Sequence, residues 1–148
     1  MTEKEDLRYC YKYPRLAMTV DAIVVAANFG QTMILLIQRK FEPFEGMWAL
    51  PGGFVGIEET LKAACVRELF EETGIQGVEL RQFYTFDALD RDPRHRTVST
   101  VFYGRVNQPL DVVGSDDADQ ADWFPITSLP EMAFDHLEII RKFVKEQL

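Results

Sequence analysis

One predicted helix carries the feature that most constrains this chain, because its charges run against the usual rules for a stable helix. Thr60 is a suitable N-cap, and Gly74 stands just past the last turn, where a left-handed residue commonly ends a helix. Glu68, Glu71 and Glu72 fall within one arc of about 100° on the helix surface. Like charges are therefore stacked near the C-terminal end, where the helix dipole also disfavours them.

Two interpretations of this acidic arc are open. It can be a solvated surface, or it can be a cation site, since Mg²⁺ takes carboxylate and phosphate oxygens and would turn repulsion into coordination. Arg67 can reach Glu71 one turn away, but one arginine does not neutralise three carboxylates. The apolar residues on the other side of the helix are expected to face a core: Ala63, Val66, Leu69 and Phe70.

The net charge of −8 limits which partners suit the chain. A protein this acidic repels a phosphate backbone, so nucleic-acid binding is not expected. A small phosphate-bearing substrate would be repelled too, unless a divalent cation lay between the two negative partners. The acidic helix and the overall charge therefore point to the same missing component, a hard metal ion.

Length and composition indicate one domain, residues 1–148, with a polar lead-in over residues 1–12. Hydrophobic residues make up 47%, which is ordinary for a globular fold. The longest apolar stretch, residues 22–27, is far short of the roughly 20 residues that span a bilayer. The N-terminus does not resemble a secretory signal, and Cys10 and Cys65 form no Cys-x-x-Cys pair. We expect a cytoplasmic protein with no membrane contact.

Hydrophobic patterning predicts strands in hairpins flanked by two helices, which is typical of a mixed sheet packed between helices. The predicted strands are residues 18–27, 33–39, 48–50, 79–87, 98–106 and 121–124. The predicted helices are residues 60–73 and 135–145. Pro51, Gly52 and Gly53 are expected to form a tight turn.

The spacing around the acidic helix matches a known signature. Gly53 is followed after five residues by Glu59, and seven residues later by the run RELFEETGI, from Arg67 to Ile75. This resembles the Nudix box, G-x5-E-x7-R-E-U-x-E-E-x-G-U with U a bulky aliphatic residue, and no fixed position departs from it. Nine constrained positions match by chance in such a chain with odds below about one in a million. The resemblance implies an α/β/α sandwich that hydrolyses a nucleoside diphosphate linked to another moiety.

The resemblance also implies a role for each box residue. The implied cofactor is Mg²⁺, for which Mn²⁺ could substitute. The carboxylates that would bind it, directly or through water, are Glu59, Glu68, Glu71 and Glu72. Glu68 and Glu72 would be the main ligands, and Arg67 would hold the carboxylates in place by ion pairing. A backbone carbonyl near Gly52 or Gly53 would complete the shell, because only glycine lets the backbone approach an ion so closely.

The expected chemistry is metal-assisted attack of water on phosphorus. The general base stays open between two locations. Glu68 is a candidate within the box. In some relatives the base is an acidic residue on a later loop, where this chain has Asp116, Asp117 and Asp119.

Three stretches outside the box, residues 13–21, 90–96 and 133–136, together with residues 48–54, are similar to archaeal-type ADP-ribose pyrophosphatases. They also resemble the Nudix-like domains of transcriptional regulators of NAD metabolism. The similarity makes ADP-ribose the leading substrate, with AMP and ribose 5-phosphate as products.

Substrate contacts are expected from an arginine-rich loop and from aromatic residues. Arg91, Arg94 and Arg96 could form fork contacts to the distal phosphate or ribose, the alternative being a solvated turn. The candidates for an aromatic platform under adenine are Tyr13, Phe41 and Phe44.

The remaining reactive side chains are expected to be structural. His95 is read as an exposed loop residue, and His136 as part of the capping and packing of the last helix. Cys65 is read as a small buried residue and not as a nucleophile.

Two alternatives to ADP-ribose hydrolysis stay open. One is hydrolysis of nucleoside triphosphates or dinucleotides, and the other is a non-catalytic sensor of NAD metabolites. An enzyme is favoured because every box residue is retained, and because no winged-helix domain is expected after Leu148. The resemblance further implies a homodimer acting on a small nucleoside diphosphate derivative.

Overall fold

Alternation along one long strand explains how the sheet of this protein is covered on both faces. In β1, Ala17–Asn28, the side chains of Val20, Ala22 and Val24 point to one face and those of Ile23 and Val25 to the other. All five are almost completely buried, so β1 is sandwiched between two apolar layers. The structure is a computed structural model that describes residues 9–114 and 118–148.

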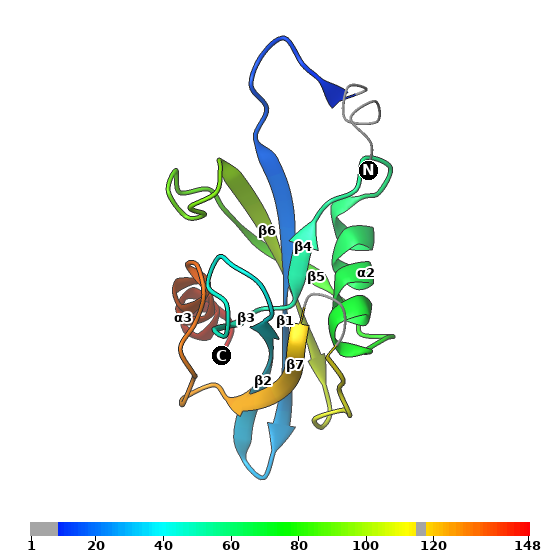
Figure 1. Cartoon of the computed structure of the whole chain (residues 1–148). Coiled ribbons are helices and arrows are strands. Elements are labelled where there is room, and N and C mark those ends of the chain that lie inside the picture. Colours follow the sequence, from blue (N-terminus) through cyan, green and yellow to red (C-terminus); the bar gives the residue numbers. More distant parts are fainter. Residues whose placement is uncertain (1–8, 115–117) are drawn as a thin grey trace.

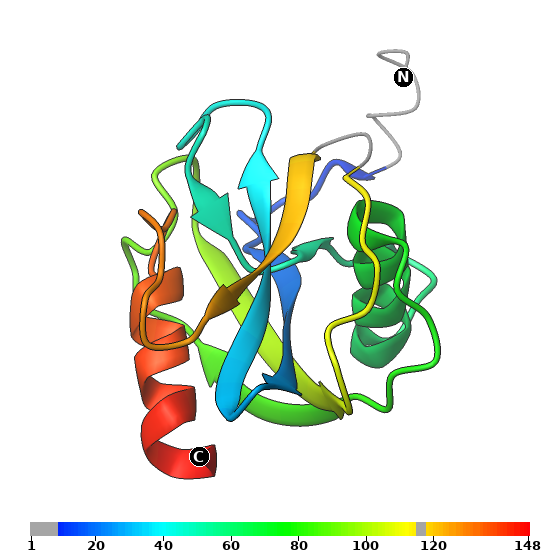
Figure 2. The same cartoon turned by 90° about the horizontal axis from the view of Figure 1, so that it is seen from below.

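Seven strands form one mixed sheet, with helix α2 on one side and helix α3 on the other (Figures 1 and 2). The strands are β1, β2 (Gln31–Arg39), β3 (Trp48–Ala49), β4 (Gly52–Phe54), β5 (Arg81–Phe86), β6 (Thr97–Val106) and β7 (Ala118–Pro125). The main path runs β3-β2-β1-β6-β5, while β4 pairs with β1 and β7 pairs with β2. The β1–β6 pair is parallel and the other pairs are antiparallel. The predicted α/β/α sandwich is confirmed.

Helix α2, Leu61–Thr73, begins and ends at the predicted capping residues. The hydroxyl oxygen of Thr60 accepts a hydrogen bond from the backbone N–H of Ala63 at 3.1 Å. Gly74 adopts φ 78° and its N–H donates to the Phe70 carbonyl at 2.8 Å, which closes the helix in the left-handed conformation that glycine favours.

The face that α2 turns to the core differs from the predicted one. Ala63 is exposed, and Val66 and Phe70 are almost half exposed, so only Leu69 of the four predicted core residues is buried. The residues that pack on the sheet with it are Ala64 and Cys65. The prediction was wrong because it turned all three glutamates toward solvent, whereas Glu72 points inward and is 7% exposed.

Helix α3, His136–Gln147, packs Ile139, Ile140 and Phe143 against the opposite face of the sheet. Its N-cap residue Asp135 makes no side-chain capping bond. Among residues 9–114 and 118–148, neither helix has the length and apolar character needed to cross a membrane.

Strand β4 replaces the tight turn that was predicted at Gly52 and Gly53. These residues pair with β1, with Gly52 opposite Asp21 and Gly53 opposite Val20. A side chain at Gly52 would collide with the Val20 carbonyl and the Asp21 carboxylate, so the close approach of β4 to β1 requires glycine there. The pairing carries the box glycines across the sheet beside α2, where they line a cavity.

Candidate active site

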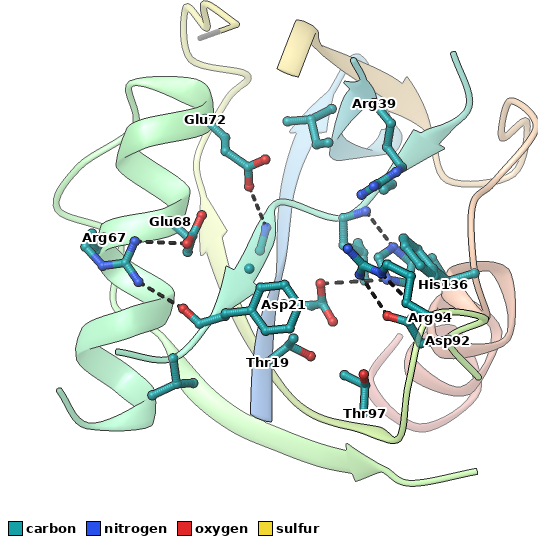
Figure 3. Close-up of a pocket in the computed structure, with 18 of the residues that line it drawn as sticks. Thr19, Asp21, Arg39, Arg67, Glu68, Glu72, Asp92, Arg94, Thr97 and His136 are labelled. Atoms are coloured by element: carbon teal, nitrogen blue, oxygen red, sulfur yellow. Dashed lines mark hydrogen bonds and ion pairs between the residues drawn. The ribbon is translucent and has the colours of Figure 1, made fainter. Parts of the chain in front are cut away.

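A cavity of about 810 Å³ opens between the C-terminal half of α2 and the start of α3 (Figure 3). One wall is acidic and comes from α2 and the loop before it. The facing wall is rich in arginine and aromatic side chains, and comes from β2, residues 90–97 and the segment before α3. The floor is formed by β1 and by the segment from Leu50 to Gly53.

Arg67 organises the acidic wall by contacting three glutamates at once. Its Nη2 lies 2.6 Å from Oε1 of Glu59, and its Nη1 lies 2.9 Å from Glu68 and 3.2 Å from Glu71. A further bond from Nη2 to the Phe54 carbonyl, 3.1 Å long, ties the guanidinium to the end of β4. One arginine thus holds three carboxylates in a fixed arrangement, as the box resemblance implied.

The same contacts set the protonation of Glu59. Hydrogen bonds from Arg67 and from the backbone N–H of Gly56 lower the pKa of Glu59 to about 2. In return, the hydrogen bonds to Glu59 and Glu68 raise the pKa of Arg67 above its already high value. The pair is therefore fully charged at neutral pH, so the acidic wall keeps its oxygens as acceptors.

Glu68 and Glu72 lie one turn apart and both line the cavity, next to the two box glycines. Glu72 accepts a hydrogen bond from the N–H of Gly52 at 2.7 Å. A side chain at Gly53 would come within 2.5 Å of the Glu68 carboxylate, so glycine is needed for that carboxylate to approach the strand. Strand β4 and helix α2 are thus in direct contact at the point where the resemblance places a metal ion.

The oxygen donors of this wall fit a hard divalent cation. Within the described residues, no group of three His, Cys, Asp or Glu side chains is placed to hold a metal ion by itself. Mg²⁺ does not need three, since it is commonly bound by one or two carboxylates and completes its shell with substrate phosphates and water. Glu68, Glu72 and the carbonyls of the adjoining glycines supply such a set.

The cavity floor contains a buried polar group of three side chains. Asp21 is 6% exposed and accepts a 2.5 Å hydrogen bond from the hydroxyl of Ser99 on the neighbouring strand β6. His136 is 5% exposed, and its Nδ1 accepts the backbone N–H of Leu50 at 3.0 Å. Burial lowers the pKa of His136, with Asp21 acting in the opposite direction, so the ring is neutral. Its remaining nitrogen, Nε2, lies 3.7 Å from Oδ1 of Asp21.

Two arginines on the facing wall are held by aspartates. Arg91 forms a two-pronged contact with Asp135, with bonds of 2.9 and 2.7 Å, and its side chain is only 4% exposed. Arg94 is held in the same manner by Asp92, at 3.1 and 2.8 Å, and is more open to solvent. The contact with Arg91 also explains why Asp135 does not cap α3.

Aromatic rings separate the guanidinium groups of this wall. The guanidinium of Arg39 lies over the Phe134 ring, with Cζ 4.8 Å from the ring centroid. The Cζ of Arg94 lies 5.7 Å from the same centroid. Arg94 also lies 5.4 Å from the ring of Phe54 on β4. Phe134 adopts φ 51°, a conformation rare for a bulky side chain, which is consistent with a position fixed by these neighbours.

The described geometry is accompanied by a direct sequence match. Residues 16–146 match the NUDIX domain family.

This chain belongs to the Nudix family.

Several Nudix proteins resemble it over nearly its whole length. The ADP-ribose pyrophosphatase of Methanocaldococcus jannaschii is 40% identical, with 97% of this chain and 82% of that protein aligned. The NUDIX domain of Shewanella oneidensis NrtR in complex with ADP ribose superposes with a TM-score of 0.86 at 28% identity, covering 100% of both chains. A bifunctional NMN adenylyltransferase/ADP ribose pyrophosphatase from Francisella tularensis, complexed with AMP and a Mn ion, gives 0.79 at 32% identity. That alignment covers 97% of this chain and 45% of the Francisella protein.

The charged residues of the Nudix box are brought together at the cavity, except Glu71. The box residues that line the cavity are Gly53, Glu59, Arg67, Glu68 and Glu72, and the neighbouring Gly52 lines it too. Glu71 is bound to Arg67 but its side chain is 48% exposed and does not line the cavity. Of the later-loop bases, Asp116 and Asp117 lie outside the described residues, and so does the side chain of Asp119.

The expected substrate-binding residues are divided by the structure. Arg91 and Arg94 line the cavity, although Arg91 is committed to Asp135. Arg96 does not line it, and its Nη1 is buried without a hydrogen-bond partner in the described part of the chain. Tyr13 and Phe44 are also not lining residues.

Of the three aromatic candidates for the adenine platform, Phe44 is packed away from the cavity. Phe44 packs edge-on against Phe134, with ring centroids 4.8 Å apart, and belongs to a small apolar cluster. Phe41, the third aromatic candidate, does line the cavity and is half exposed. Tyr13 is 67% exposed.

The remaining reactive residues are placed as follows. Cys65 is buried, and burial raises the pKa of its thiol to about 12, which confirms the expectation of an inert side chain. His95 is exposed, as expected, and bonds to Thr97 at 2.8 Å. His136 packs at the start of α3 but does not cap it, because its ring bonds to Leu50 in another element.

Sequence reasoning gave no site role to several residues that line the cavity, among them Asp21, Arg39, Phe134 and His136. For Asp21 a signal was present, since an aspartate beside a run of apolar residues in a central strand is rarely buried without a role. Phe134 and His136 lie in the stretch 133–136 that resembles ADP-ribose pyrophosphatases, but the contact of Arg39 with Phe134 forms only through tertiary packing.

Proposed function

We propose that this Nudix protein hydrolyses the diphosphate linkage of ADP-ribose, giving AMP and ribose 5-phosphate. One observation carries the proposal: Glu59, Arg67, Glu68 and Glu72 of the Nudix box line one wall of a cavity whose other wall presents arginine and aromatic groups. The acidic wall suits a metal-bound diphosphate, and the facing wall suits the sugar and base attached to it.

The comparisons support this choice of substrate within the family. The Methanocaldococcus relative is named for the same activity, and 40% identity over nearly the whole chain includes residues well beyond the box. The Shewanella domain, which superposes over its full length, was crystallised with ADP ribose. ADP-ribose is therefore favoured over nucleoside triphosphates as the main substrate.

The chain's own residues have separable tasks in the proposed reaction. Glu68 and Glu72 would hold Mg²⁺ against the diphosphate, and Arg67 would keep the carboxylates oriented. When bound, the ion neutralises the phosphates and lowers the pKa of the attacking water. The water oxygen adds to one phosphorus as the bond from that phosphorus to the bridging oxygen breaks. The base that takes the proton is Glu68 or one of the acidic residues between positions 116 and 119.

The proposal extends to the setting of the enzyme. Mg²⁺ is its cofactor, with Mn²⁺ able to substitute, in line with the Mn ion in the Francisella complex. We expect residues 1–148 to act as one Nudix domain in the cytoplasm, and as a homodimer. Gel filtration with light scattering tests the last point.

A substrate panel tests the function. ADP-ribose, NADH, diadenosine polyphosphates, nucleotide sugars and nucleoside triphosphates are each incubated with protein and Mg²⁺, and the products are resolved by chromatography. AMP and ribose 5-phosphate formed from ADP-ribose at the highest kcat/KM is the expected result. Faster release of diphosphate from a triphosphate would overturn the substrate. Tight ADP-ribose binding without turnover of any compound would indicate a sensor instead.

A further inference from the structure

The carboxylate of Asp21 and the ring of His136 face one another at the floor of the cavity (Figure 3). Both are more than nine-tenths buried, and they come from opposite parts of the chain, β1 and the first turn of α3. Each is fixed by a second bond on its far side: Asp21 by the Ser99 hydroxyl and His136 by the Leu50 N–H. The pair is therefore rigid and preorganised.

The bond to Leu50 determines what His136 offers to the cavity. Because Nδ1 accepts the Leu50 N–H, the proton of the neutral ring must be on Nε2, which makes Nε2 a donor. Within the described residues, Nε2 has only Oδ1 of Asp21 nearby, at 3.7 Å, which is too long for a hydrogen bond. Oδ1 of Asp21 likewise has no closer hydrogen-bond donor in this part of the chain. One donor and one acceptor thus stand side by side, unpaired.

We propose that this pair is a subsite for a ribose hydroxyl of the substrate, which would donate to Asp21 and accept from His136. A hydroxyl is the group that does both through a single oxygen, and an oxygen about 2.8 Å from each atom can bridge the gap. An ionised phosphate oxygen carries no proton, so it could accept from His136 but could not donate a hydrogen bond to Asp21. This inference rests on the proposed function and adds a specificity determinant to it, distinct from the metal-binding wall.

The subsite has a consequence for specificity that can be measured. A buried donor and acceptor left unpaired by a substrate that lacks the hydroxyl cost binding free energy, so discrimination against such a substrate is strong. ADP-ribose contains two riboses that could supply the hydroxyl. The analogues deoxygenated at C2 or C3 of the adenosine ribose, or at C1, C2 or C3 of the distal ribose, separate these sources.

Two substitutions of His136 separate substrate contact from support of Leu50. In His136→Asn the amide oxygen can replace Nδ1 and still accept the Leu50 N–H, but the donor at Nε2 is lost. In His136→Gln the longer side chain places its amide donor near Nε2 and gives up the Leu50 bond. A purely structural histidine would be replaced better by asparagine, and a substrate-contacting one better by glutamine. Glu146→Gln, on the exposed side of α3, serves as the control.

The experiment measures binding by calorimetry of ADP-ribose and of each deoxy analogue, all with a methylene-bridged diphosphate that resists hydrolysis, to the Mg²⁺-loaded protein, alongside kcat/KM of the hydrolysable compounds and the melting temperature. One deoxy analogue should bind wild type about 10- to 100-fold more weakly than ADP-ribose. His136→Asn should lose most of that preference with a near-normal melting temperature. His136→Gln should keep more of it despite a lower melting temperature.

The outcomes separate this subsite from the function on which it rests. Equal binding of ADP-ribose and all deoxy analogues to a wild-type protein that hydrolyses ADP-ribose overturns the subsite and leaves the function standing. The subsite is also overturned if only the replacement of adenosine by inosine weakens binding, because Asp21 and His136 would then contact the base and not a ribose hydroxyl. A wild-type protein with neither binding nor hydrolysis of ADP-ribose overturns the function and the subsite together. If His136→Asn fails to fold, the wild-type analogue series alone decides.

Discussion

The two walls of the cavity use charge in opposite ways. On the α2 wall one arginine, Arg67, is shared among the three carboxylates of Glu59, Glu68 and Glu71. On the facing wall Arg91 and Arg94 each have their own aspartate. The first wall therefore keeps an excess of negative charge, whereas the second is close to neutral.

This difference shows what each wall can recognise. An excess of carboxylate oxygen is stable only with a cation, so the α2 wall is incomplete without a metal ion. The paired arginines offer shape, stacking and remaining N–H donors without a strong field. We therefore expect substitutions on the α2 wall to abolish turnover and substitutions on the facing wall to weaken substrate binding.

The largest effect is expected for Glu72→Gln. The amide oxygen can still accept the Gly52 N–H, so the fold should be retained, but the negative charge that would hold the metal is lost. We expect kcat to fall by roughly three orders of magnitude with an unchanged melting temperature. Glu71→Gln, whose carboxylate lies outside the cavity, should lose clearly less. Equal losses would show that position in the cavity is not what matters.

Arg67→Lys should have the next largest effect. A lysine keeps the charge, but its compact ammonium cannot hold three carboxylates in the geometry that the guanidinium provides. Affinity for Mn²⁺, followed by electron paramagnetic resonance, should fall about 10- to 100-fold. Arg81→Lys, on an exposed strand with one distant partner, is the matched control. Unaltered Mn²⁺ affinity would mean that Arg67 does not organise the metal ligands.

Arg94→Lys probes the facing wall. The substitution keeps the charge near Asp92 and removes the planar group that lies against Phe54 and Phe134. KM for ADP-ribose should rise about tenfold while kcat changes little, because the wall binds the substrate and does not hold the metal. A fall in kcat at constant KM would contradict the division between the walls.

Asp92→Asn should give the smallest effect, on stability. Burial alone would raise the pKa of Asp92, but hydrogen bonds from Arg94 outweigh it and hold the pKa below its ordinary value. A carboxyl whose pKa is lowered by folding stabilises the protein above its unfolded pKa, about 3.9, and that stabilisation is lost as pH falls through the folded value. The variant should lose about 1 kcal/mol at pH 7, since Arg94 is partly exposed.

Urea unfolding at several pH values between 7 and 3 measures this effect. The stability of wild type should fall more steeply than that of Asp92→Asn below about pH 4. Asp111→Asn, at an exposed position, should follow wild type. Parallel curves for wild type and Asp92→Asn would show that the Arg94 contact contributes nothing to folding.

The sequence was most informative where a local pattern encodes the structure. The limits of α2 follow from its capping residues Thr60 and Gly74. The box spacing identified the α2 wall because the box residues lie close together along the chain. The strands were also found, apart from β4, since alternation of apolar residues is a local signal.

Only Arg91 and Arg94 of the facing wall were predicted, because most of the contacts that build this wall join distant residues. Arg91 meets Asp135, and His136 meets Leu50, only after the sheet has brought β6, β3 and α3 together. The glycines at 52 and 53 were read as a turn for the same reason: their strand partner Asp21 lies far earlier in the chain. The orientation of α2 was misjudged because a glutamate facing inward becomes reasonable only beside the Gly52 N–H.

The short segment from Leu50 to Gly52 is held at both ends by side chains of different helices, by His136 of α3 at one end and Glu72 of α2 at the other. A related protein can therefore lose hydrolase activity while all of its box glutamates are retained. A change at the first residue of α3 would release one end of the segment and shift the backbone that meets Glu72. An intact motif is thus no guarantee of an active descendant, and the start of α3 should be inspected before activity is inferred from the motif.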